Sequence, residues 1–442
     1  MAISTNPWVL LIGVGPLADA TATALTGAGV RVRRLDDPAD SAIRDALDDR
    51  NAQIDRVVVI SRFDHASLRI ALVVEHVRPG IPLLVTIFDR DAAAHLQATV
   101  DNVQVLSMAD IVAPALAGLC FDPELLWVSR GSAGVEGIAA VDGEPRSVTP
   151  ARTAPRRTRR MFESLHALVR PFDASARILV IGLLGFVGVL VLETLVTMIE
   201  GGESLIDAFY TVAKVTVTVG PNAAADSGDD WFKLFSAIAM LATLGFAAVF
   251  TAGLVNRLLD PRLTGILGRS AVPRRDHVVV VGLGQVGLRL CMLLRDLGVP
   301  VVSVEQNPDA KNVTRGKDLR IPVVVGSGAS QGVLRRLSID GARALAAVTS
   351  DEVENIAIAV AARGLRDDLT VVLRAGSGEA ASETQSLFGV GSIRDVYGIA
   401  GTVLAAVALG SRATTGFPYK GTLYLVDEQR NVEPFVRAPA GC

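Results

Sequence analysis

Cysteine is scarce in this chain of 442 residues, and the three that occur, Cys120, Cys291 and Cys442, lie far apart. An odd number of separated cysteines without metal-ligand spacing excludes a disulfide framework and favours a reducing cytoplasm. Histidine is also rare, and its five residues are scattered, so we expect no metal site. The formal net charge of −3 excludes few kinds of partner. No basic region precedes the first short apolar run, residues 9–14, so a cleavable signal peptide is not expected.

Two long apolar segments, residues 178–199 and 234–256, distinguish this chain from an ordinary soluble protein. The first carries a single charge, Glu193, and the second carries none. At about 1.5 Å of rise per residue, each segment can cross a hydrocarbon core of about 30 Å. We therefore predict transmembrane helices over residues 176–199 and 232–258.

The charges around these segments predict their orientation. Arginines cluster before the first segment and after the second, whereas the loop between them is mostly acidic. Basic residues stay on the cytoplasmic side, so both termini are expected inside a multi-pass protein of the plasma membrane, the inner membrane of the cell. The arginine run could also be a nucleic-acid patch, but it lacks interleaved aromatic residues and adjoins a membrane span. No nucleic-acid partner is expected.

The loop between the spans has the pattern of an ion pore. Residues 207–222 read DAFYTVAKVTVTVGPN, an amphipathic half-helix followed by an extended Thr-Val-Thr-Val-Gly turn. Such a helix points its dipole at the ion path, and the turn presents main-chain carbonyls that replace the water around an ion. Non-helical backbone at membrane depth is tolerated where it lines a cavity. The alternative is a surface strand rich in β-branched residues between two buried helices.

The sequence outside the membrane contains two related copies. The C-terminal copy opens with His277-VVVVGLGQVG, where Gly282, Gly284 and Gly287 join a buried strand to a helix. The next strand ends at Glu305, about 20 residues after the turn, as in a dinucleotide-binding fingerprint. These residues predict a nucleotide site in a Rossmann-like domain; the alternative is that the glycines only pack the helix on the sheet.

The N-terminal copy is less complete. Its first strand runs into Gly13 and Gly15, but Ala18 replaces the third glycine and Pro16 begins the helix; the second strand ends at Asp36. Gly13, Gly15 and Asp36 therefore mark a possible second site.

Later segments of the two copies also correspond. Residues 55–90 parallel 344–375, and residues 103–118 parallel 392–410. The N-terminal copy has only a short polar stretch where the C-terminal copy has residues 321–342. We infer that the first copy lacks a strand and a helix, which makes its nucleotide site the less credible one.

These patterns predict an α/β fold class with two Rossmann-like cytoplasmic domains and an all-α membrane pore domain. The expected boundaries are an N-terminal domain at 1–130, a linker at 131–170, a pore domain at 171–260 and a C-terminal domain at 274–442. The pore loop is placed at 203–222, and a terminal strand pair is expected at 422–437.

The C-terminal half resembles an RCK domain, the regulator of potassium conductance found on prokaryotic potassium channels. The resemblance is carried by VVVVGLGQVG, Glu305, VVGSGAS, the TSDEVENIAIAVAARGL helix and Arg374. The middle resembles a two-span potassium channel, through LIDAFYTVAKVTVTVGPN and a following helix that contains Gly245. The N-terminal copy resembles a degenerate RCK domain. The resemblance implies a homotetramer in a lipid bilayer, with a cytoplasmic ring whose shape responds to ligand.

The resemblance also implies roles for particular residues. Gly245 would be a gating hinge. The regulatory ligand would be NAD(H) or an adenine nucleotide, and the permeant ion K⁺ or another monovalent cation. The implied selectivity filter is Thr218, Val219, Gly220, Pro221 and Asn222. The implied nucleotide-binding residues are Gly282, Gly284, Gln285, Val286, Gly287, Glu305, Gln306, Ser327 and Arg374.

Two positions depart from the family pattern. The usual Thr-Val-Gly-Tyr-Gly filter here ends in Pro221 and Asn222; proline lacks an N–H and fixes φ, so the outer ion sites would be altered. A less selective cation pore is therefore an alternative to strict potassium selectivity. Ser327 stands where RCK domains commonly have aspartate, which favours phosphate over a divalent metal.

Glu193 has two readings. A charge inside a membrane span usually has a partner, and Lys214 of the pore helix is a candidate. Alternatively, the carboxylate reaches the outer membrane interface.

The predicted function is a nucleotide-gated cation channel, which is not an enzyme. A non-conducting membrane sensor is one alternative, favoured by the altered filter. A membrane-tethered NAD-dependent oxidoreductase is a weaker one, because no substrate domain and no acid–base group accompany the glycines.

Overall fold

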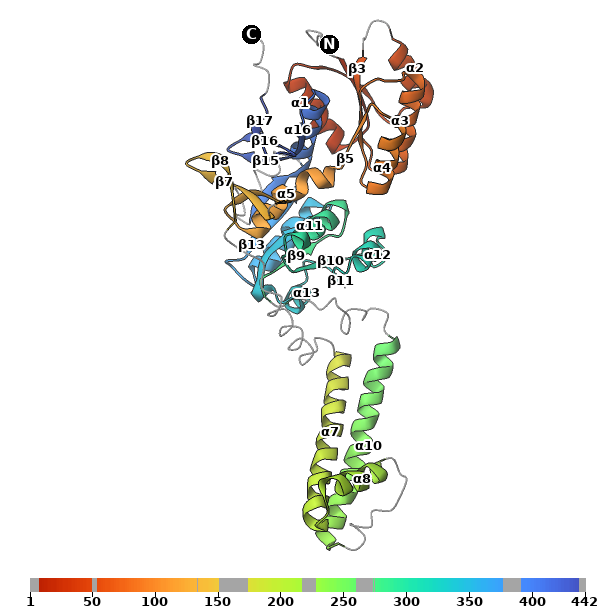
Figure 1. Ribbon diagram of the computed structural model, residues 1–442, viewed down its shortest axis with the longest axis vertical. Helices are drawn as coiled ribbons and strands as arrows, with labels where there is room; N and C mark the ends of the chain where they lie inside the picture. The colour runs from red at the N-terminus through yellow and green to blue at the C-terminus, as the bar shows by residue number, and fades with distance from the viewer. Residues whose placement is uncertain are drawn as a thin grey trace. The chain divides into compact units, whose positions relative to one another are not determined.

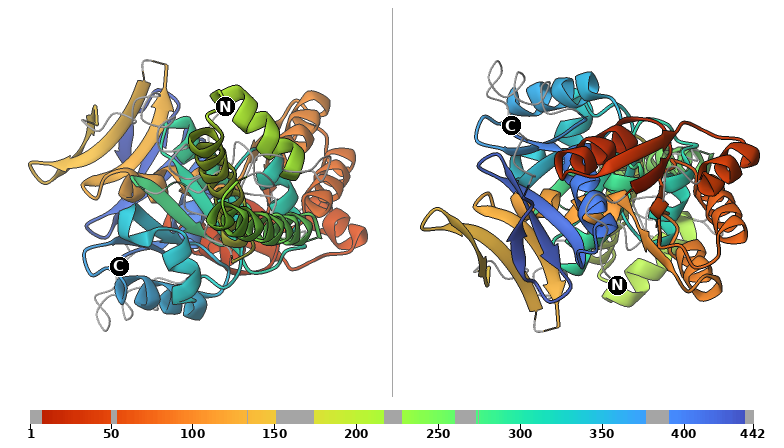
Figure 2. Two further views of the ribbon diagram at one scale, coloured as in Figure 1. Left: turned by 90° about the horizontal axis from the view of Figure 1, so that it is seen from below. Right: turned by 90° about the horizontal axis from the view of Figure 1, so that it is seen from above.

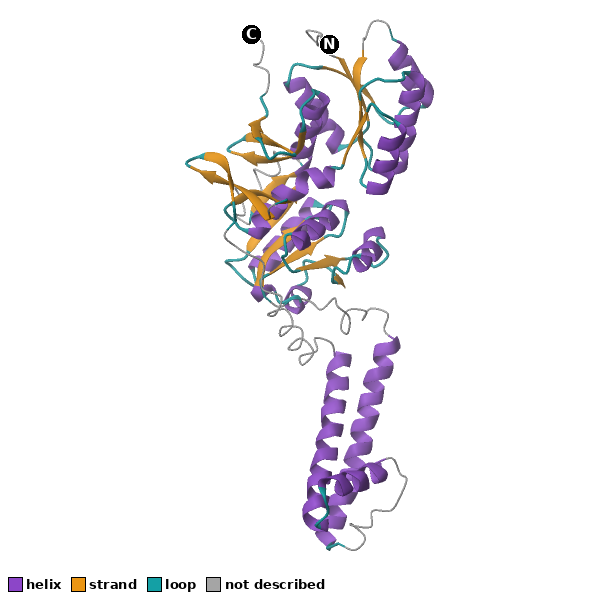
Figure 3. Ribbon diagram, in the orientation of Figure 1, coloured by secondary structure: helices purple, strands orange, loops and turns teal. Residues whose placement is uncertain are grey.

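The computed structural model of the chain describes most of its residues (Figure 1). The described residues are 8–49, 54–132, 134–150, 174–216, 228–259, 273, 275–376 and 391–436. The chain forms two compact units, one made of residues 1–155 and 272–442 and the other of residues 156–271. The first unit is therefore discontinuous in sequence. Figure 3 colours helices purple and strands orange; the first unit contains both, and the described elements of the second unit are helices.

The N-terminal copy is built on a parallel five-stranded sheet with the order β2-β1-β3-β4-β5. Its central strands are continuous runs of Val, Leu and Ile because helices cover both faces. The elements are β1 (Trp8–Ile12), α1 (Pro16–Gly27), β2 (Arg31–Leu35), α2 (Asp40–Asp48), β3 (Ile54–Val59), α3 (Asp64–Val77), β4 (Leu83–Thr86), α4 (Arg90–Thr99), β5 (Val103–Leu106) and α5 (Met108–Phe121).

The C-terminal copy has a parallel six-stranded sheet with the order β11-β10-β9-β12-β13-β14. Its elements are β9 (His277–Val281), α11 (Gln285–Asp296), β10 (Val301–Glu305), α12 (Lys311–Asp318), β11 (Val323–Val325), α13 (Gln331–Arg336), the 3-10 helix η2 (Ile339–Gly341), β12 (Ala342–Ala347), α14 (Glu352–Arg363), β13 (Thr370–Ala375), β14 (Ser392–Asp395) and α16 (Val396–Ala408).

The two sheets confirm the predicted Rossmann-like class and the missing strand. Where the C-terminal copy has α12, β11 and α13, the N-terminal copy has α2 alone. The stretch predicted to be merely polar is thus a helix, because Ile43, Ala46 and Leu47 give it a buried face at helical spacing.

The two copies exchange their last helices. Helix α16 of the C-terminal copy packs on α1 of the N-terminal copy, and α5 of the N-terminal copy packs on α11 of the C-terminal copy. Figures 1 and 2 show α1 and α16 side by side. Gly401 allows the close approach, since a Cβ there would lie 2.8 Å from the main-chain carbon of Ala20. One core cluster therefore contains residues of both copies.

Each copy ends in a three-stranded antiparallel sheet. The first comprises β6 (Leu125–Gly131), β7 (Gly134–Val141) and β8 (Glu144–Val148), and the second β15 (Ala413–Tyr419), β16 (Thr422–Asp427) and β17 (Val432–Pro434). The indole N–H of Trp127 donates a hydrogen bond to Thr415 Oγ1 at 3.0 Å between them. The predicted linker is therefore wrong over residues 131–148, which bury apolar residues such as Ile138 in the shared core. The predicted terminal strand pair is a three-stranded sheet that also includes β15.

The second unit contains α7 (Ala174–Gly201), α8 (Leu205–Thr216) and α10 (Asp230–Leu259). Within α7 and α10, residues Ile178–Gly201 and Asp230–Val255 are long and apolar enough to cross a membrane, and only 17% of the most apolar window of each is buried. The two helices approach closely at Gly182, where a Cβ would lie 2.6 Å from the main-chain nitrogen of Phe250. The predicted filter residues lie outside the described residues.

Glu193 and Lys214 do not pair in the part of the chain that the structure describes. Glu193 is 2% exposed, and its Oε1 atom has no hydrogen-bond partner there. The ammonium group of Lys214 lies 5.2 Å from the centre of the Tyr210 ring instead. The hypothesis of a Glu193–Lys214 ion pair within one chain is therefore wrong, as is the alternative that Glu193 is open to the outer interface in the single chain.

Replacing Gly401 by alanine should lower the free energy of unfolding by about 1–3 kcal/mol, because α1 and α16 must separate to admit the methyl group. Thermal or denaturant unfolding of the purified full-length protein measures this. The matched control is Gly332→Ala in α13, where the nearest atom to a new Cβ is Ser330 Oγ at 3.7 Å. This control should stabilise by up to about 1 kcal/mol through helix propensity. Equal effects of the two substitutions would contradict the close approach.

Acidification should destabilise the unit that contains His277. Burial lowers the pKa of His277 to about 4 from 6.5, and its Nε2 lies 2.9 Å from the Leu337 carbonyl oxygen. Between these two pKa values the unfolded chain binds the extra proton, so stability falls as the pH drops from 6.5 towards 4, by about 2–3 kcal/mol. His277→Gln should flatten this dependence in unfolding measured from pH 7 to pH 4. The same slope in both proteins would show that other groups cause it.

Candidate nucleotide-binding site

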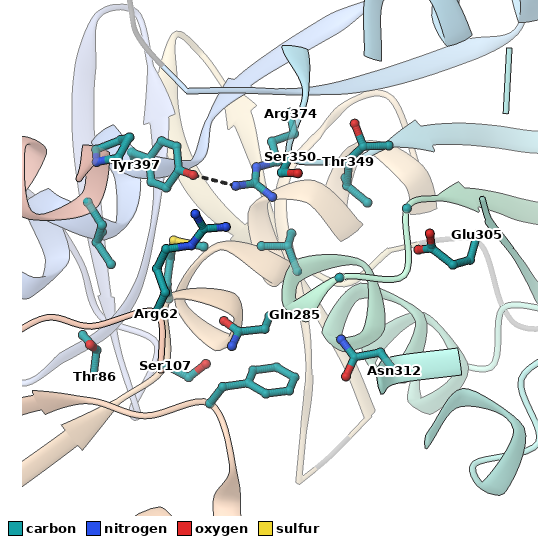
Figure 4. A pocket seen from close by; sticks show the side chains of 18 of the residues that line it. Arg62, Thr86, Ser107, Gln285, Glu305, Asn312, Thr349, Ser350, Arg374 and Tyr397 are labelled. Carbon is teal, nitrogen blue, oxygen red and sulfur yellow. Dashed lines mark hydrogen bonds between the residues drawn. The ribbon is translucent and has the colours of Figure 1, made fainter. Parts of the chain in front are cut away.

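A cavity of about 970 Å³ opens where the carboxyl ends of the two sheets meet (Figure 4). Such edges are the usual ligand sites of parallel α/β sheets. Both copies line the cavity, the C-terminal one with its glycine turn and the tips of β10, β12 and β13. Its volume suffices for a nucleotide.

Two of the three glycines of the turn after β9, Gly282 and Gly287, cannot be replaced by larger residues without rearrangement. Gly282 has φ +95°, and a Cβ there would lie 2.9 Å from Thr349 Cα. A Cβ on Gly287 would lie 1.9 Å from the Gly282 oxygen. Gly284, in contrast, has no atom within 4 Å of its Cβ position and lines the cavity. The turn thus leaves backbone accessible for close approach by a ligand.

Glu305 is held beside this turn at the tip of β10. Its Oε2 accepts a hydrogen bond from the Leu283 N–H at 2.8 Å, and its Oε1 accepts one from the Asn307 N–H at 3.1 Å. Each oxygen retains a lone pair, so the carboxylate can also accept bonds from ribose hydroxyls.

Helix α11 begins at the cavity. No side chain caps its first turn, and its first residues, Gln285 and Val286, line the cavity. The free N–H groups and the positive end of the helix dipole together form a site for phosphate.

Arg374 and Tyr397 form the wall opposite the turn. The Arg374 Nη2 donates a hydrogen bond to the Tyr397 hydroxyl at 2.9 Å, and its guanidinium carbon lies 5.4 Å from the ring centre. Gln306 also lines the cavity, whereas Ser327 does not, although Gly326 and Gly328 on either side of it do.

The residues predicted for a second site are arranged differently. Gly13 and Gly15 have positive φ values of +150° and +94°, as a tight turn requires. Asp36 does not bond that turn; it accepts a 2.6 Å hydrogen bond from Arg34 Nε. None of the three lines the cavity, which Val14, Pro16 and Leu17 line instead.

Sequence reasoning missed several cavity residues. Arg62 and Thr86 come from the N-terminal copy, and Asn312, Thr349 and Ser350 from the C-terminal copy. Arg62, Thr349 and Ser350 follow strand ends, Thr86 is the last residue of β4, and Asn312 lies in the first turn of α12. Aligning the two copies residue by residue at their strand ends could have predicted these cavity residues from the sequence.

Comparison with known families identifies the C-terminal copy. Residues 278–392 match the TrkA-N domain family. This copy is therefore similar to TrkA-N domains. Gly282, Gly284, Gly287 and Glu305 all lie within the matched residues of the TrkA-N domain.

Full-length relatives extend the similarity beyond the TrkA-N domain. Potassium channel protein 1 of Methanocaldococcus jannaschii is 24% identical over 238 residues, covering 52% of this chain and 70% of the relative. The voltage-gated potassium channel Kch of Escherichia coli is 22% identical over 175 residues, covering 39% and 42%. These relatives confirm the predicted resemblance to potassium channels and, with the two apolar helices, indicate a membrane protein.

A solved structure of the GsuK channel bound to NAD shares 12% identity, with a TM-score of 0.49, covering 92% of this chain and 65% of that chain.

Replacing Glu305 by alanine should weaken adenosine binding by about ten- to a hundredfold, because bonds to a charged acceptor are lost and the glycine turn loosens. Calorimetric titration of the purified full-length protein with adenosine measures this. The control is Asp309→Ala, an exposed residue shortly after β10 that does not line the cavity. Unchanged affinity in Glu305→Ala would remove Glu305 from the site.

Proposed function

We propose that this chain forms a cation channel that conducts passively and is regulated by nucleotide binding to its TrkA-N domain. One observation carries the proposal: a short pore-type helix between two apolar helices is inserted into a unit that holds a nucleotide-type cavity. The regulatory ligand is NAD(H) or an adenine nucleotide, and the permeant ion is K⁺ or another monovalent cation. No catalytic residue is required.

The second unit supports a pore made of several chains. Large apolar residues of α8 and α10 are exposed in the single chain, among them Ile206, Tyr210, Leu241 and Leu244. Lipid or neighbouring subunits must cover these side chains in a membrane. A homotetramer in the inner membrane, with both termini cytoplasmic, would place α8 beside a shared axis, with Thr218 to Asn222 as the filter and Gly245 as the hinge.

The cavity supports nucleotide rather than another ligand. Gly282, Gly284 and the uncapped start of α11 suit phosphate, and Glu305 suits ribose. Gln285, Val286, Gln306 and Arg374 would complete the contacts, and Gly287 keeps helix and turn close. Ser327 and the trio Gly13, Gly15 and Asp36 are not among the residues that line the cavity, so we assign them no direct role.

Regulation requires that nucleotide bind the conducting and non-conducting states with different affinity. The second unit joins the first through both of its ends. A ligand-dependent change in the first unit would therefore act on α7 and α10 together.

Liposome flux tests this function. Protein reconstituted in liposomes should pass K⁺, and NAD(H) or ADP should change the rate by about 5- to 150-fold, the range of typical allosteric coupling. Na⁺ and Ca²⁺ gradients compare selectivity. Glu305→Ala is the matched variant, expected to conduct without responding to nucleotide.

Absence of flux under all conditions, with nucleotide still bound, would favour the non-conducting sensor suggested by Pro221 and Asn222. Oxidation of an organic substrate with NAD would favour the oxidoreductase.

A further inference from the structure

The cavity is built from equivalent positions of the two copies. Strand registers pair Val59 with Val85 in the N-terminal sheet and Ala347 with Leu373 in the C-terminal sheet. One residue further on, the Ile60 N–H donates to the Ile12 carbonyl oxygen in the first copy, and the Val348 N–H donates to the Val281 carbonyl oxygen at the equivalent place in the second.

Counting onward from these pairs, Arg62 occupies the position of Ser350, and Thr86 occupies that of Arg374. All four residues line the same cavity (Figure 4). At these two positions each copy therefore supplies one arginine and one hydroxyl group, in exchanged order.

The two arginines lack a carboxylate partner. In the part of the chain that the structure describes, the side chain of Arg374 donates a hydrogen bond only to the hydroxyl of Tyr397, and Arg62 forms no hydrogen bond or ion pair. Both side chains point into the cavity from opposite copies in Figure 4. Like charges brought into one cavity repel each other, so the arrangement is stabilised when an anion lies between them.

The acidic residues that line the cavity do not pair with the two arginines in the described chain. Asp64 accepts hydrogen bonds from the N–H groups of Phe88 and Asp89 at 2.9 and 3.0 Å. Glu305 is bonded to the glycine turn, and Glu354 lies in the first turn of α14. In the part of the chain that the structure describes, none of these carboxylates forms an ion pair with Arg62 or Arg374.

We propose that the cavity is one composite site, in which the phosphate chain of a nucleotide held by the TrkA-N domain extends between Arg374 and Arg62. This inference rests on the proposed nucleotide regulation. The N-terminal copy then binds no nucleotide of its own and contributes Arg62 to the ligand of the other copy. The expected ligand class is a nucleotide with two or more phosphates, bound once per chain.

The composite site explains why Glu305 and Asp36, the acids that end the second strand of each copy, have different hydrogen-bond partners. Glu305 bonds its glycine turn and is positioned for ribose, whereas Asp36 pairs with Arg34. A copy that supplies only a phosphate contact does not need a ribose-binding acid.

Calorimetric titration with ADP and with adenosine separates the phosphate contact from the nucleoside contact. In Arg62→Ala, ADP affinity of the full-length protein should fall about ten- to a hundredfold, since bonds to charged groups are lost, while adenosine affinity stays unchanged. Arg62→Lys should restore part of the ADP affinity. The control is Arg69→Ala, which removes an exposed arginine that pairs with Asp40 on the same copy.

Each outcome has a distinct meaning. Equal ADP affinity in Arg62→Ala and the unaltered protein would overturn the composite site and leave nucleotide regulation standing. An equal loss of ADP and adenosine binding would show that Arg62 only supports the structure, and would also overturn it. Two ADP molecules bound per chain would exclude a single shared site. If the unaltered protein binds neither ligand, the proposed nucleotide regulation fails together with this inference.

Discussion

The packing of α16 on α1 and of α5 on α11 is the constraint on which the rest of the structure depends. Because each copy gives its last helix to the other, one core cluster is built from residues of both copies, although each copy also has a cluster of its own. The buried guanidinium of Arg289 strengthens this junction: it donates to the Phe88 carbonyl at 2.8 Å and lies 3.3 Å from Asp110. Burial lowers the pKa of Arg289, while the charge of Asp110 opposes this shift. Two related domains are thereby held as one unit.

The cavity follows from this junction. Exchange of the helices brings the carboxyl ends of both sheets to one place, so a single space is lined by both glycine-turn regions. With two identical copies, such a space would be symmetric. Here the copies differ at Glu305 and Asp36 and at the two arginine positions, and the site is therefore asymmetric. The N-terminal copy lacks a fingerprint acid at its glycine turn, yet its strand ends still line the cavity.

Much of the fold could be read from local sequence. Continuous apolar strands, the glycines of residues 282–287 and the acid at Glu305 are local signals with a direct structural meaning, as are the two apolar spans. The strands β7 and β8 were missed because β7 is rich in glycine and alanine and β8 has no buried residue, so neither shows an apolar run typical of a strand. The sequence did contain a sign that this sheet repeats the C-terminal one. Val141-Asp142 and Val426-Asp427 stand at corresponding places, each before a turn of a three-stranded sheet.

The packing of one copy on the other could not be predicted from local sequence. No local pattern states that α16 packs on α1 rather than on its own sheet, since an apolar helix rich in alanine suits either surface. The cavity residues contributed by the N-terminal copy depend on that choice, so Arg62 looked like an ordinary polar turn residue. The prediction that Glu193 pairs with Lys214 was wrong for the same reason, because helical spacing does not tell which neighbour a side chain faces.

The discontinuity of the first unit also has a consequence for biosynthesis. Nearly the whole chain separates α1 from α16, so at about 5–20 residues per second the ribosome needs tens of seconds to supply the partner of α1. During that time the apolar surfaces of α1 and α5 lack their covering helices. Until then the nascent N-terminal half exposes apolar surface, which makes it prone to aggregation. Its maturation is therefore completed only after translation has passed residue 408.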